Sequence, residues 1–600
     1  MTDSLNPQES PRATYSRRLE ELRNSQSQLD RRHRRIGTVN VSAGVAAVLV
    51  IVAALAFQAV SILWILVPLF VLIFFVVLHQ RVLKALRKIS RAIGFYERGL
   101  ARLDGSWAGG GESGERFLDE SHPYARDLDL FGRGSLFELL STARTRAGEE
   151  TLASWLLHPA SLDEIHARQA AITELKNRVS LREEMAVLGE DFRTGVQPEA
   201  LAAWGEGKIL LKPGFVQAAV SVLAVLWLLS LVAWGVWGIV FAALIMTVVN
   251  LCVAYRFRER LEKFVPAIEE AAHDLALLSQ VLARLEREKF ASPRLGELHS
   301  ALEVQGVVPS RSIARLDHLV ERLESREHLL LRIIDPLVFW TLRITFSIES
   351  WHRTFGPAIR GWLQAVGEME ALLALAGYAY EHPADVFPKF TGEGPCFDAE
   401  EFAHPLLPES RAVRNNLKLD AGLQLVIISG PNMAGKSTLI RAVGANALLA
   451  QAGAPVRARR LRLSRLAVAA SICVLDSLQG GVSRFYAEIT RLKIISDLTA
   501  GPEPVLFLLD ELLQGTNSHD RRIGAEAMVK SLVQRGAVGL VTTHDLALTR
   551  IADSMQPRAA NFHFDDRIED GKLIFDYRLS PGIAQSSNAL ELMRSIGLEI

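Results

Sequence analysis

The chain has 600 residues, and its 67 basic and 67 acidic side chains give a formal net charge of zero. This balance excludes an argument from overall charge for nucleic acid or for an acidic partner, so any such surface must be local. The three cysteines, Cys252, Cys396 and Cys473, lie far apart, which argues against a disulfide framework and a cysteine-based metal site. The length suggests about three or four domains.

Two long stretches of the sequence carry no charged side chain. Residues 36–78 and 213–255 contain no Asp, Glu, Lys, Arg or His. A single helical crossing of a membrane takes about 20 residues, so each stretch is long enough to cross twice. Each therefore predicts a transmembrane helical hairpin, with tips near Gln58–Ser61 and Trp234–Gly238. The alternative, buried core helices, would not normally remain free of charge over such a length.

The flanks of the two stretches predict the orientation of the hairpins. Positive charge at both ends of a hairpin keeps both ends in the cytoplasm. The polar residues 1–35 do not have the pattern of a cleaved signal peptide. We therefore expect a multi-pass cell-membrane protein with four spans and with both termini in the cytoplasm. The basic flanks are 31–35 and 81–88 for the first hairpin, and Lys208, Lys212 and 256–260 for the second.

The rest of the sequence divides by composition. The glycine-rich residues 104–115 lack the strand-before, helix-after context of a nucleotide loop, so they predict a flexible linker. Helical periodicity covers 127–177 and 257–380, and short β-branched runs alternate with helices from about 395 onward. The expected domains are a cytoplasmic tail (1–35), a transmembrane hairpin (36–80), a basic stretch and glycine-rich linker (81–125), a helical core (126–205), a second transmembrane hairpin (206–257), long helices (258–385) and an α/β nucleotide domain (386–600).

A glycine-rich loop predicts a nucleotide site. The segment "GPNMAGKST" follows the strand-like "LQLVIIS" and opens the apolar run "LIRAVGANALLA". Its spacing, G-x-x-x-x-G-K-S, is that of a phosphate-binding loop, in which backbone N–H groups and a helix N-terminus hold phosphates and the lysine reaches the β/γ oxygens. The expected ATP-binding residues are Gly430, Pro431, Asn432, Met433, Ala434, Gly435, Lys436, Ser437 and Thr438.

Two further strands predict the catalytic groups. The run "VLFLLDE" ends in Asp510 and Glu511, and "VGLVTTHD" carries His544 at its end. Asp510 and the Ser437 hydroxyl would hold Mg²⁺, and Glu511 would orient or deprotonate the attacking water. His544 would contact the γ-phosphate. A lone histidine is more often structural, but its place at a strand end beyond the Asp-Glu pair favours the functional interpretation.

The order of these motifs is similar to that of ABC-type ATPases. That resemblance implies hydrolysis of ATP between two nucleotide domains, and hence a homodimer in which a loop of one protomer reaches its partner's nucleotide. The candidate loop lies in "DSLQGGVSRFYAEITRL", where Gly480 and Gly481 would approach phosphate and Ser483 would supply a hydroxyl. The other interpretation is an ordinary glycine turn before a helix. The position of the segment within the order of motifs favours the loop that reaches the partner's nucleotide.

The surrounding residues resemble the MutS family of DNA mismatch-repair ATPases. "DELLQGTNSHD" is similar to the family's Asp-Glu, Gly-Thr and terminal Asp pattern, "SRFYAEI" matches Ser-x-Phe-x-x-Glu, and "TTHD" resembles the Thr-His strand end. "HPLL" and "NNLKL" are similar to the segment leading into the loop, and "SLFELLSTARTRAGEETLASWLLHP" and "GEMEALLALAGYAY" to the helical core and the lever helix. The resemblance covers roughly 126–200 and 360–600. It implies an α/β ABC-type P-loop ATPase domain, an all-α core with lever helices, and ATP with Mg²⁺.

Several departures from the family bear on function. The family's mismatch-reading domain carries a Phe-x-Glu pair, and "FYE" at 95–97 has that spelling, but it lies in a basic helical stretch without the surrounding domain. We therefore interpret it as a coincidence. The second hairpin lies in the general place of the DNA clamp. Ala412 stands where the family often stacks an aromatic side chain on adenine, and Ala434 departs from the family's loop.

Two basic stretches are candidates for contact with phosphate. In 457–465 arginine alternates with leucine and alanine, which also describes a solvated strand face, and 256–263 is better explained by lipid headgroups. The sequence thus predicts a membrane-anchored, MutS-like homodimeric ATPase whose DNA binding prefers shape and ignores a mismatch. The alternatives are an ABC-type export or lipid-handling machine, and a membrane scaffold that ATP switches without DNA.

Overall fold

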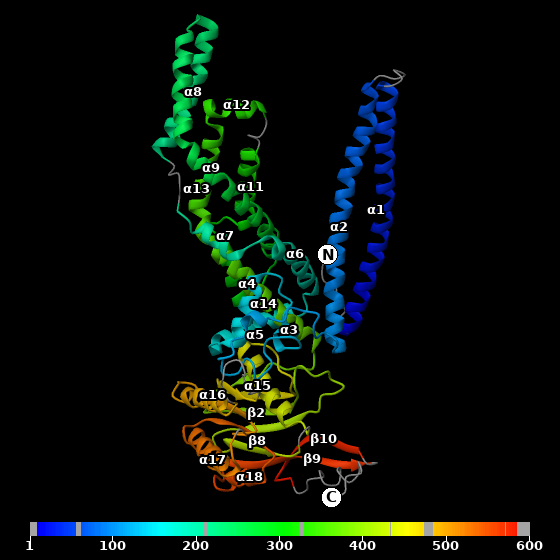
Figure 1. Ribbon diagram of the computed structural model, residues 1–600, viewed down its shortest axis with the longest axis vertical. Helices are drawn as coiled ribbons and strands as arrows, with labels where there is room; N and C mark the ends of the chain where they lie inside the picture. The colour runs from blue at the N-terminus through cyan, green and yellow to red at the C-terminus, as the bar shows by residue number, and fades with distance from the viewer. Residues whose placement is uncertain are drawn as a thin grey trace. The chain divides into compact units, whose positions relative to one another are not determined.

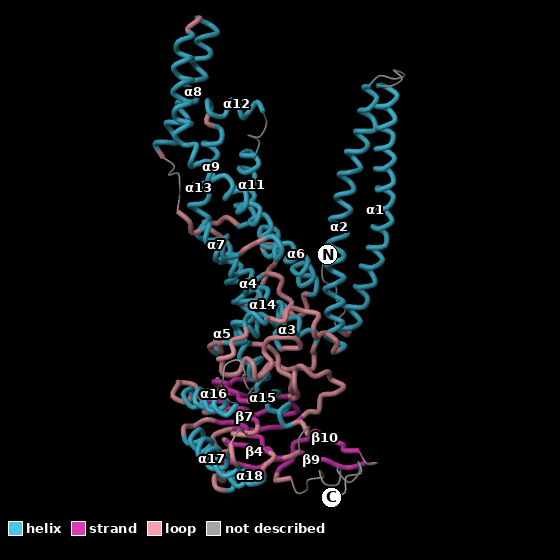
Figure 2. Tube along the Cα trace, viewed as in Figure 1, coloured by secondary structure: helices cyan, strands magenta, loops and turns pink. Residues whose placement is uncertain are grey.

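A computed structural model describes residues 9–55, 62–208, 214–324, 329–431, 434–472, 484–514, 516–569 and 572–584. The chain is mostly helical, and its strands form two mixed sheets in the C-terminal part (Figure 2). This agrees with the predicted combination of an all-α part and an α/β part. Two compact units are present: unit 1 is Met1–Thr142, Leu152–Val187 and Leu373–Ile600, and unit 2 is Ala143–Thr151 and Leu188–Leu372. Three of their four boundaries fall inside helices α4 (Arg146–Leu157), α6 (Val179–Gly195) and α14 (Ile359–Glu381), and the fourth lies between Thr142 and Ala143, before α4.

The first apolar stretch forms part of two long helices in unit 1. Helix α1 (Pro11–Leu55) lies beside α2 (Leu66–Asp104), which follows the 3-10 turn η1 (Ile62–Ile65) (Figure 1). The polar halves of the two helices pack through the buried Tyr15, Phe95 and Tyr96. Their apolar halves instead expose large side chains, among them Val48, Leu49, Phe70, Ile73 and Phe74. Both helices are long and apolar enough to cross a membrane, by length and composition.

The second apolar stretch forms a helical pair in unit 2. Helix α8 (Phe215–Trp237) ends at Gly238, which adopts a left-handed conformation (φ +70°), and α9 (Val240–Leu285) begins directly afterwards. The turn therefore lies where the sequence predicted the second tip. Two spans of this pair, Phe215–Trp237 and Val240–Glu262, also have the length and composition to cross a membrane. The first predicted tip, Gln58–Ser61, lies outside the described residues.

The remaining helices are shorter. Helix α11 (Pro309–Glu324) shows why they pack as they do. Its residues Ile313, Leu316, Val320 and Leu323 recur at helical spacing and are buried, and the helix contacts α9 and α13 (Trp340–Phe355). The other elements are η2 (Glu115–Phe117), α3 (Leu136–Leu140), α5 (Leu162–Leu175), α7 (Pro198–Gly205), α10 (Pro293–Leu302), α11 (Pro309–Glu324), α12 (Leu329–Val338), α13 (Trp340–Phe355) and η4 (Gly356–Ala358).

The glycine-rich segment after α2 is held in place, unlike the flexible linker expected from its composition. The buried carboxylate of Glu138 accepts hydrogen bonds from the backbone N–H groups of Gly109 (2.7 Å), Gly111 (3.0 Å) and Gly134 (2.6 Å). At Gly114 φ is +67°, and a Cβ there would lie 2.6 Å from the Phe137 ring. The glycines therefore allow a close approach around one buried acid, which composition alone does not reveal.

Two sheets make up the C-terminal part of unit 1. The smaller has the order β1-β5-β2-β3, formed by β1 (Lys389–Phe390), β2 (Phe397–Phe402), β3 (Asn415–Leu419) and β5 (Arg460–Leu463). The larger has the order β10-β9-β4-β8-β7-β6, and only its edge strand β10 is antiparallel. Its strands are β4 (Leu425–Ser429), β6 (Ala467–Ser471), β7 (Val505–Asp510), β8 (Val538–Thr543), β9 (Ala559–Glu569) and β10 (Lys572–Pro581).

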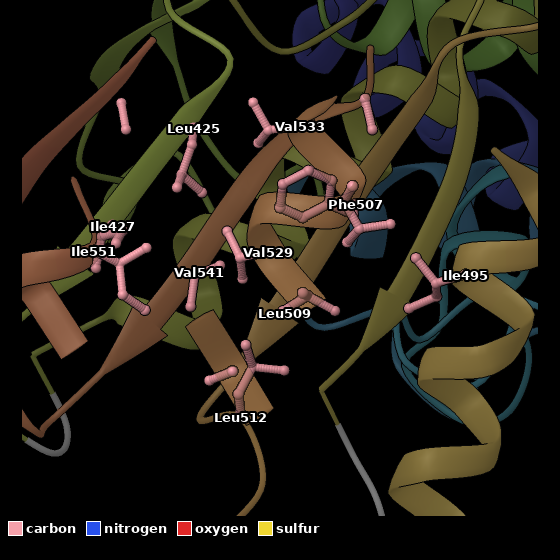
Figure 3. Packing of buried hydrophobic residues seen from close by; sticks show 14 of the residues in the cluster. Leu425, Ile427, Ile495, Phe507, Leu509, Leu512, Val529, Val533, Val541 and Ile551 are labelled. Carbon is pink, nitrogen blue, oxygen red and sulfur yellow. The ribbon is translucent and has the colours of Figure 1, made fainter. Parts of the chain in front are cut away.

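Helices cover both faces of the larger sheet, which explains why its strands are almost continuously apolar. On one face α15 (Lys436–Ala452) comes so close that a Cβ at Gly444 would lie 2.6 Å from Leu128 and 2.9 Å from Leu508. On the other face α16 (Arg484–Leu498), α17 (Ser518–Gln534) and α18 (Leu546–Asp553) share one core with the sheet (Figure 3). That core includes Leu425, Ile427, Ile495, Phe507, Leu509, Leu512, Val529, Val533, Val541 and Ile551.

Candidate nucleotide site

The glycine-rich loop lies between a fully buried strand and a helix N-terminus. It connects β4 to α15, whose first turn has no side-chain cap. Two of its glycines have positive φ values, which favour glycine: +146° at Gly430 and +97° at Gly435. A Cβ at Gly430 would lie 3.1 Å from the Phe564 carbonyl oxygen, and one at Gly435 would lie 3.0 Å from the Tyr577 ring. Uncapped N–H groups at a helix start suit an anion. Asn432 and Met433 lie outside the described residues.

Lys436 is the first residue of α15 and is almost fully buried. Its Nζ donates hydrogen bonds to the carbonyl oxygens of Gly430 (2.6 Å) and Pro431 (2.9 Å). Burial lowers the pKa of Lys436, and the carboxylates of Glu511 and Asp510 oppose that shift. The ammonium therefore lies within the electrostatic reach of both predicted acidic groups. Beside it Ser437 is half-buried and Thr438 is exposed.

The predicted acidic pair and histidine meet at one edge of the sheet. Strands β4, β8 and β7 are neighbours, and the register pairs Ser429 with Thr543 and Asp510 with Thr542. The carboxyl ends of parallel neighbouring strands lie together, so the loop after β4 and the residues after β7 and β8 share this edge. His544 Nδ1 is 3.3 Å from Glu511 Oε1.

The backbone around Glu511 adopts an unusual conformation. Its φ is +52° and that of Leu513 is +55°, a region that costs non-glycine residues free energy and recurs at functional sites. Glu511 N–H donates to the Thr542 carbonyl oxygen (3.2 Å), and the Gln514 amide donates to the Glu511 carboxylate. The Thr542 hydroxyl donates to Asp510. Sequence reasoning missed Thr542 and Gln514 as supports for the acidic pair, although both lie inside the quoted motifs.

The helix that carries the Ser-x-Phe-x-x-Glu motif contacts the same region. Glu488 on α16 is buried, and its carboxylate accepts a hydrogen bond from the backbone N–H of Leu513. Arg491, one turn further along, donates to the carbonyl oxygen of His122 and lies 3.5 Å from the buried Asp127 carboxylate. The motif's glutamate thus ties α16 to the loop that carries Glu511. Gly480, Gly481 and Ser483 lie outside the described residues.

A cavity of about 480 Å³ adjoins the loop. It lies between the start of α15 and the β2, β3, β9 and β10 strands. Ala412, the position expected at a stacked adenine, is not among the lining residues, whereas Arg411 and Val413 are. The aromatic lining instead comes from elsewhere in the chain, which the sequence pattern did not indicate. The lining residues are Phe402, Ala403, His404, Leu407, Arg411, Val413, Asn415, Gly435, Thr438, Leu439, Ala442, Phe564 and Tyr577.

Hydrogen bonds between the Asn415 side chain and the backbone of β10 hold Tyr577 at the cavity. Asn415 Nδ2 donates to the Tyr577 carbonyl oxygen (3.0 Å), and its Oδ1 accepts from the Leu579 N–H (2.8 Å). Opposite, His404 is buried, and this burial, with the nearby Arg441 and Arg457, lowers its pKa to about 4. His404 is therefore neutral at physiological pH, and its Nδ1 accepts from the Leu406 N–H (3.2 Å).

The Phe-x-Glu spelling at 95–97 does not form an exposed wedge. Phe95 and Tyr96 are 5% and 2% exposed, in the core that joins α1 and α2. Glu97 forms an ion pair with Arg23 (2.8 Å). A side chain that must insert between base pairs has to be accessible, so the burial of Phe95 agrees with interpreting the spelling as a coincidence.

The arginines of 457–465 are compensated by carboxylates. In β5 the side chains alternate between exposed and buried, which is the pattern of a solvated strand face. Every arginine of this stretch has an acidic partner, so the stretch offers little uncompensated charge to nucleic-acid phosphates. The pairs are Arg457 with Glu409, Arg459 with Glu400 (3.0 Å), Arg460 with Glu400 (2.6 Å), Arg462 with Glu393 (3.1 Å) and Arg465 with Glu503 (2.9 Å).

The fold and the site define an α/β domain with a glycine-rich loop and acidic strand ends at one sheet edge, preceded by helices. Comparison with known proteins supplies the family. The profile of MutS domain V matches residues 426–599, and that of MutS domain III matches residues 124–197. The chain belongs to the MutS family. These matches fall within the two regions in which the sequence motifs carried the resemblance.

Curated relatives agree with this assignment. The DNA mismatch repair protein MutS of Thermus caldophilus is 28% identical over 503 residues, which is 78% of this chain and 59% of the relative. The MutS proteins of Thermus aquaticus and Natronomonas pharaonis are 30% and 35% identical, over 52% and 39% of this chain and 34% and 27% of their own lengths. The chain thus spans less than two thirds of the length of the relatives it matches.

Proposed function

We propose that this chain is a membrane-anchored ATP hydrolase of the MutS type. The observation that best supports the proposal is the shared sheet edge, where Lys436 opens α15 and where Asp510, Glu511 and His544 end the neighbouring strands. The family assignment supports it independently, since the longer of the two family matches covers this domain.

In this proposal each side chain has one task. Lys436 and the uncapped N–H groups of α15 bind phosphate oxygens, and Ser437 and Asp510 offer a hydroxyl and a carboxylate, ligands that suit a hard cation. Mg²⁺, when bound, would neutralise charge on the transferred phosphoryl group. Glu511 orients a water molecule and accepts its proton, while His544 donates a hydrogen bond to the γ-phosphate and reports its presence.

The described residues do not favour a metal site of another kind. Among them, no group of at least three His, Cys, Asp or Glu side chains is placed to hold a metal ion. A site with only one carboxylate and one hydroxyl from the protein is what a phosphate-bound Mg²⁺ requires, because the substrate and water complete the coordination.

The proposal includes a homodimer with composite sites. In each, Ser483 of one protomer reaches the nucleotide of its partner. The bond between Glu488 and the Leu513 N–H supports this role, since it couples the helix after Ser483 to the loop of Glu511 within one protomer. Closure on ATP would thereby be communicated to the hydrolytic group.

Anchoring in a membrane rests on the two apolar helical pairs. Exposed large side chains along them would be costly in water, and they match the needs of a lipid-facing surface. We propose four spans with both termini and residues 81–212 in the cytoplasm. Labelling of single cysteines from the external face tests this: reaction near 235 but not at 150 is expected, and the reverse would contradict the topology.

Coupling to DNA is the third part of the proposal, by analogy with relatives named DNA mismatch repair proteins. The burial of Phe95 and the paired arginines of 457–465 support weak, salt-sensitive binding that follows DNA shape and not a single mispair. Competition between matched and G·T-containing duplexes checks this. A preference of about tenfold, or 1.4 kcal/mol, for the mismatch would contradict it.

The deciding experiment is ATP hydrolysis by the full chain in lipid nanodiscs. Lys436→Met should abolish Mg²⁺-dependent hydrolysis, whereas Lys493→Met, at an exposed residue paired with Asp497, should not. Equal activity in the two variants would contradict the proposed site. Stimulation by branched or duplex DNA supports the MutS-type function, while stimulation by lipid alone would favour an export or lipid-handling machine.

A further inference from the structure

A second cavity lies in unit 2, at the point where α9 changes from apolar to charged. Its volume is about 550 Å³, within the range of roughly 300–1,000 Å³ typical of ligand pockets. Along α9 the lining begins at Leu251, in the apolar stretch, and continues beyond the charged residues Arg258 and Glu262. The lining includes Leu251, Arg258, Glu262, Asp335, Phe339 and Thr341.

The opposite wall of this cavity is a break between two helices. Phe339 has φ of +53° and separates α12 from α13, and it is buried in a cluster with Val220 and Ala224 of α8. The fully buried Asn250 donates from Nδ2 to the Leu337 carbonyl oxygen (2.7 Å). This bond satisfies a carbonyl at the end of α12 and holds the break against the apolar part of α9.

Helix α12, which forms part of this wall, has exposed apolar side chains. Ile333 and Ile334 are 64% and 40% exposed, next to the exposed Arg332. Such a mixture is typical of a helix in the plane of a membrane surface. Helix α12 contacts α8 and α9, which also expose apolar side chains, among them Leu244, Ile245 and Leu251.

The charged groups of the cavity suit a phospholipid headgroup. The Arg258 side chain is 70% exposed, and its Nε donates a hydrogen bond to the Glu262 carboxylate (2.7 Å). A guanidinium binds phosphate well, and a neighbouring carboxylate suits an ammonium. Asp335 is already engaged, because it accepts from the Thr341 N–H (2.8 Å) and hydroxyl (2.7 Å).

We propose that this cavity binds one acyl chain of a phospholipid of the cytoplasmic leaflet, with the phosphate at Arg258. The apolar walls cover the chain, and the cavity spans the level at which a bilayer changes from hydrocarbon to headgroup. The inference rests on the proposed membrane anchoring, because it takes its ligand from the bilayer around α8 and α9.

The test uses the full chain in nanodiscs that contain phosphatidylethanolamine with a diazirine on one acyl chain. After irradiation, peptide mapping should find adducts on Leu261–Pro266 and Asp335–Leu342, in addition to adducts on the outer surface of α8. Leu251→Trp should lower the cavity adducts by about fivefold or more, because the indole fills the volume of the chain. The matched control Leu229→Trp, at an exposed position of α8, should lower neither set.

The outcomes separate the two proposals. Adducts on α8 with none on Asp335–Leu342, or equal cavity labelling in Leu251→Trp, would overturn the lipid site and leave the anchoring intact. An absence of adducts on α8 as well would contradict the anchoring itself.

A headgroup comparison tests Arg258. Native mass spectrometry of the detergent-extracted protein should find phospholipid retained by the wild type and by Arg256→Gln, whose parent side chain is exposed and outside the cavity. Retention should fall by about fivefold in Arg258→Gln, since the phosphate loses its partner. Equal retention in the two variants would overturn the assignment of the phosphate to Arg258.

Discussion

The carboxylate of Glu511 lies 3.3 Å from the imidazole Nδ1 of His544, across the carboxyl ends of strands β7 and β8. Each residue follows its strand directly, and the parallel register of β7 and β8 brings the two together. In the proposed mechanism this pair joins the group that activates water to the group that detects the γ-phosphate. The pair is held from two further sides, by the Thr542 backbone and the Gln514 amide.

Replacing Glu511 by Gln should preserve nucleotide binding and lower turnover by about 10²–10⁴-fold, because the water loses its base while the phosphate contacts remain. Single-turnover hydrolysis and equilibrium ATP binding measure the two effects separately. Glu526→Gln, at a helix-surface residue paired with Lys530, is the control and should change neither. Normal turnover in Glu511→Gln would remove this residue from the proposed role.

Glu488→Ala should lower the rate of hydrolysis by roughly tenfold or more with little change in nucleotide affinity. The variant leaves the buried Leu513 N–H without its acceptor, and this loop positions Glu511. Glu488→Gln keeps a carbonyl oxygen in the same place, so it should retain most of the activity. If both variants lose activity and affinity together, Glu488 acts on folding and not on the position of the loop.

The buried ion pair of Arg102 with Glu381 should stabilise the contact of α2 with the end of α14. Arg102 donates to Glu381 from Nε (2.7 Å) and Nη2 (2.6 Å), and the side chains are 10% and 1% exposed. Arg102→Gln leaves a buried carboxylate unpaired, which costs roughly 3–5 kcal/mol. The double variant Arg102→Gln/Glu381→Gln should lose less than the sum of the single variants.

Amide hydrogen exchange of the last turns of α14 measures this local free energy. The exposed pair of Arg23 with Glu97 provides the control, and Arg23→Gln should change the exchange by less than about 1 kcal/mol. Additive losses in the Arg102 and Glu381 variants would show that the two groups do not act as a pair.

His404 should make the α/β domain sensitive to acid. Burial lowers its pKa to about 4, below the ordinary 6.5, so the unfolded chain takes up this proton at a higher pH than the folded chain. Stability is therefore lost as the pH falls from 6.5 towards 4, by roughly 3 kcal/mol in full. His404→Asn keeps an acceptor near the Leu406 N–H but does not titrate in this range.

Thermal unfolding of the protein between pH 5 and pH 7 checks this prediction, because this range covers the upper part, pH 5 to 6.5, of the interval over which the stability is lost. The drop in unfolding temperature on acidification should be smaller in His404→Asn than in the wild type. His318→Asn, at a residue whose side chain is 74% exposed in unit 2, should leave the drop unchanged. Equal pH dependence in all three proteins would contradict the role of His404.

Local sequence patterns were enough to predict several structural features of this protein. The charge-free stretches, the turn at Gly238, the loop before Lys436 and the strand ends at Asp510 and His544 follow from spacing and composition, since each depends on residues that are neighbours in the chain. The alternation in Arg460–Leu463 likewise indicated a solvated strand face. These features have a signal within one helix turn or one strand.

Only the tertiary structure decided the rest. It placed Phe564 and Tyr577 at the cavity beside the loop, gathered the glycine-rich segment around Glu138, and buried Phe95 between α1 and α2. It also matched the arginines of 457–465 with carboxylates from other segments. Each of these contacts joins residues that are far apart in the chain. A contact of this kind leaves no periodic mark on either segment, so it depends on which surfaces the packed elements bring together.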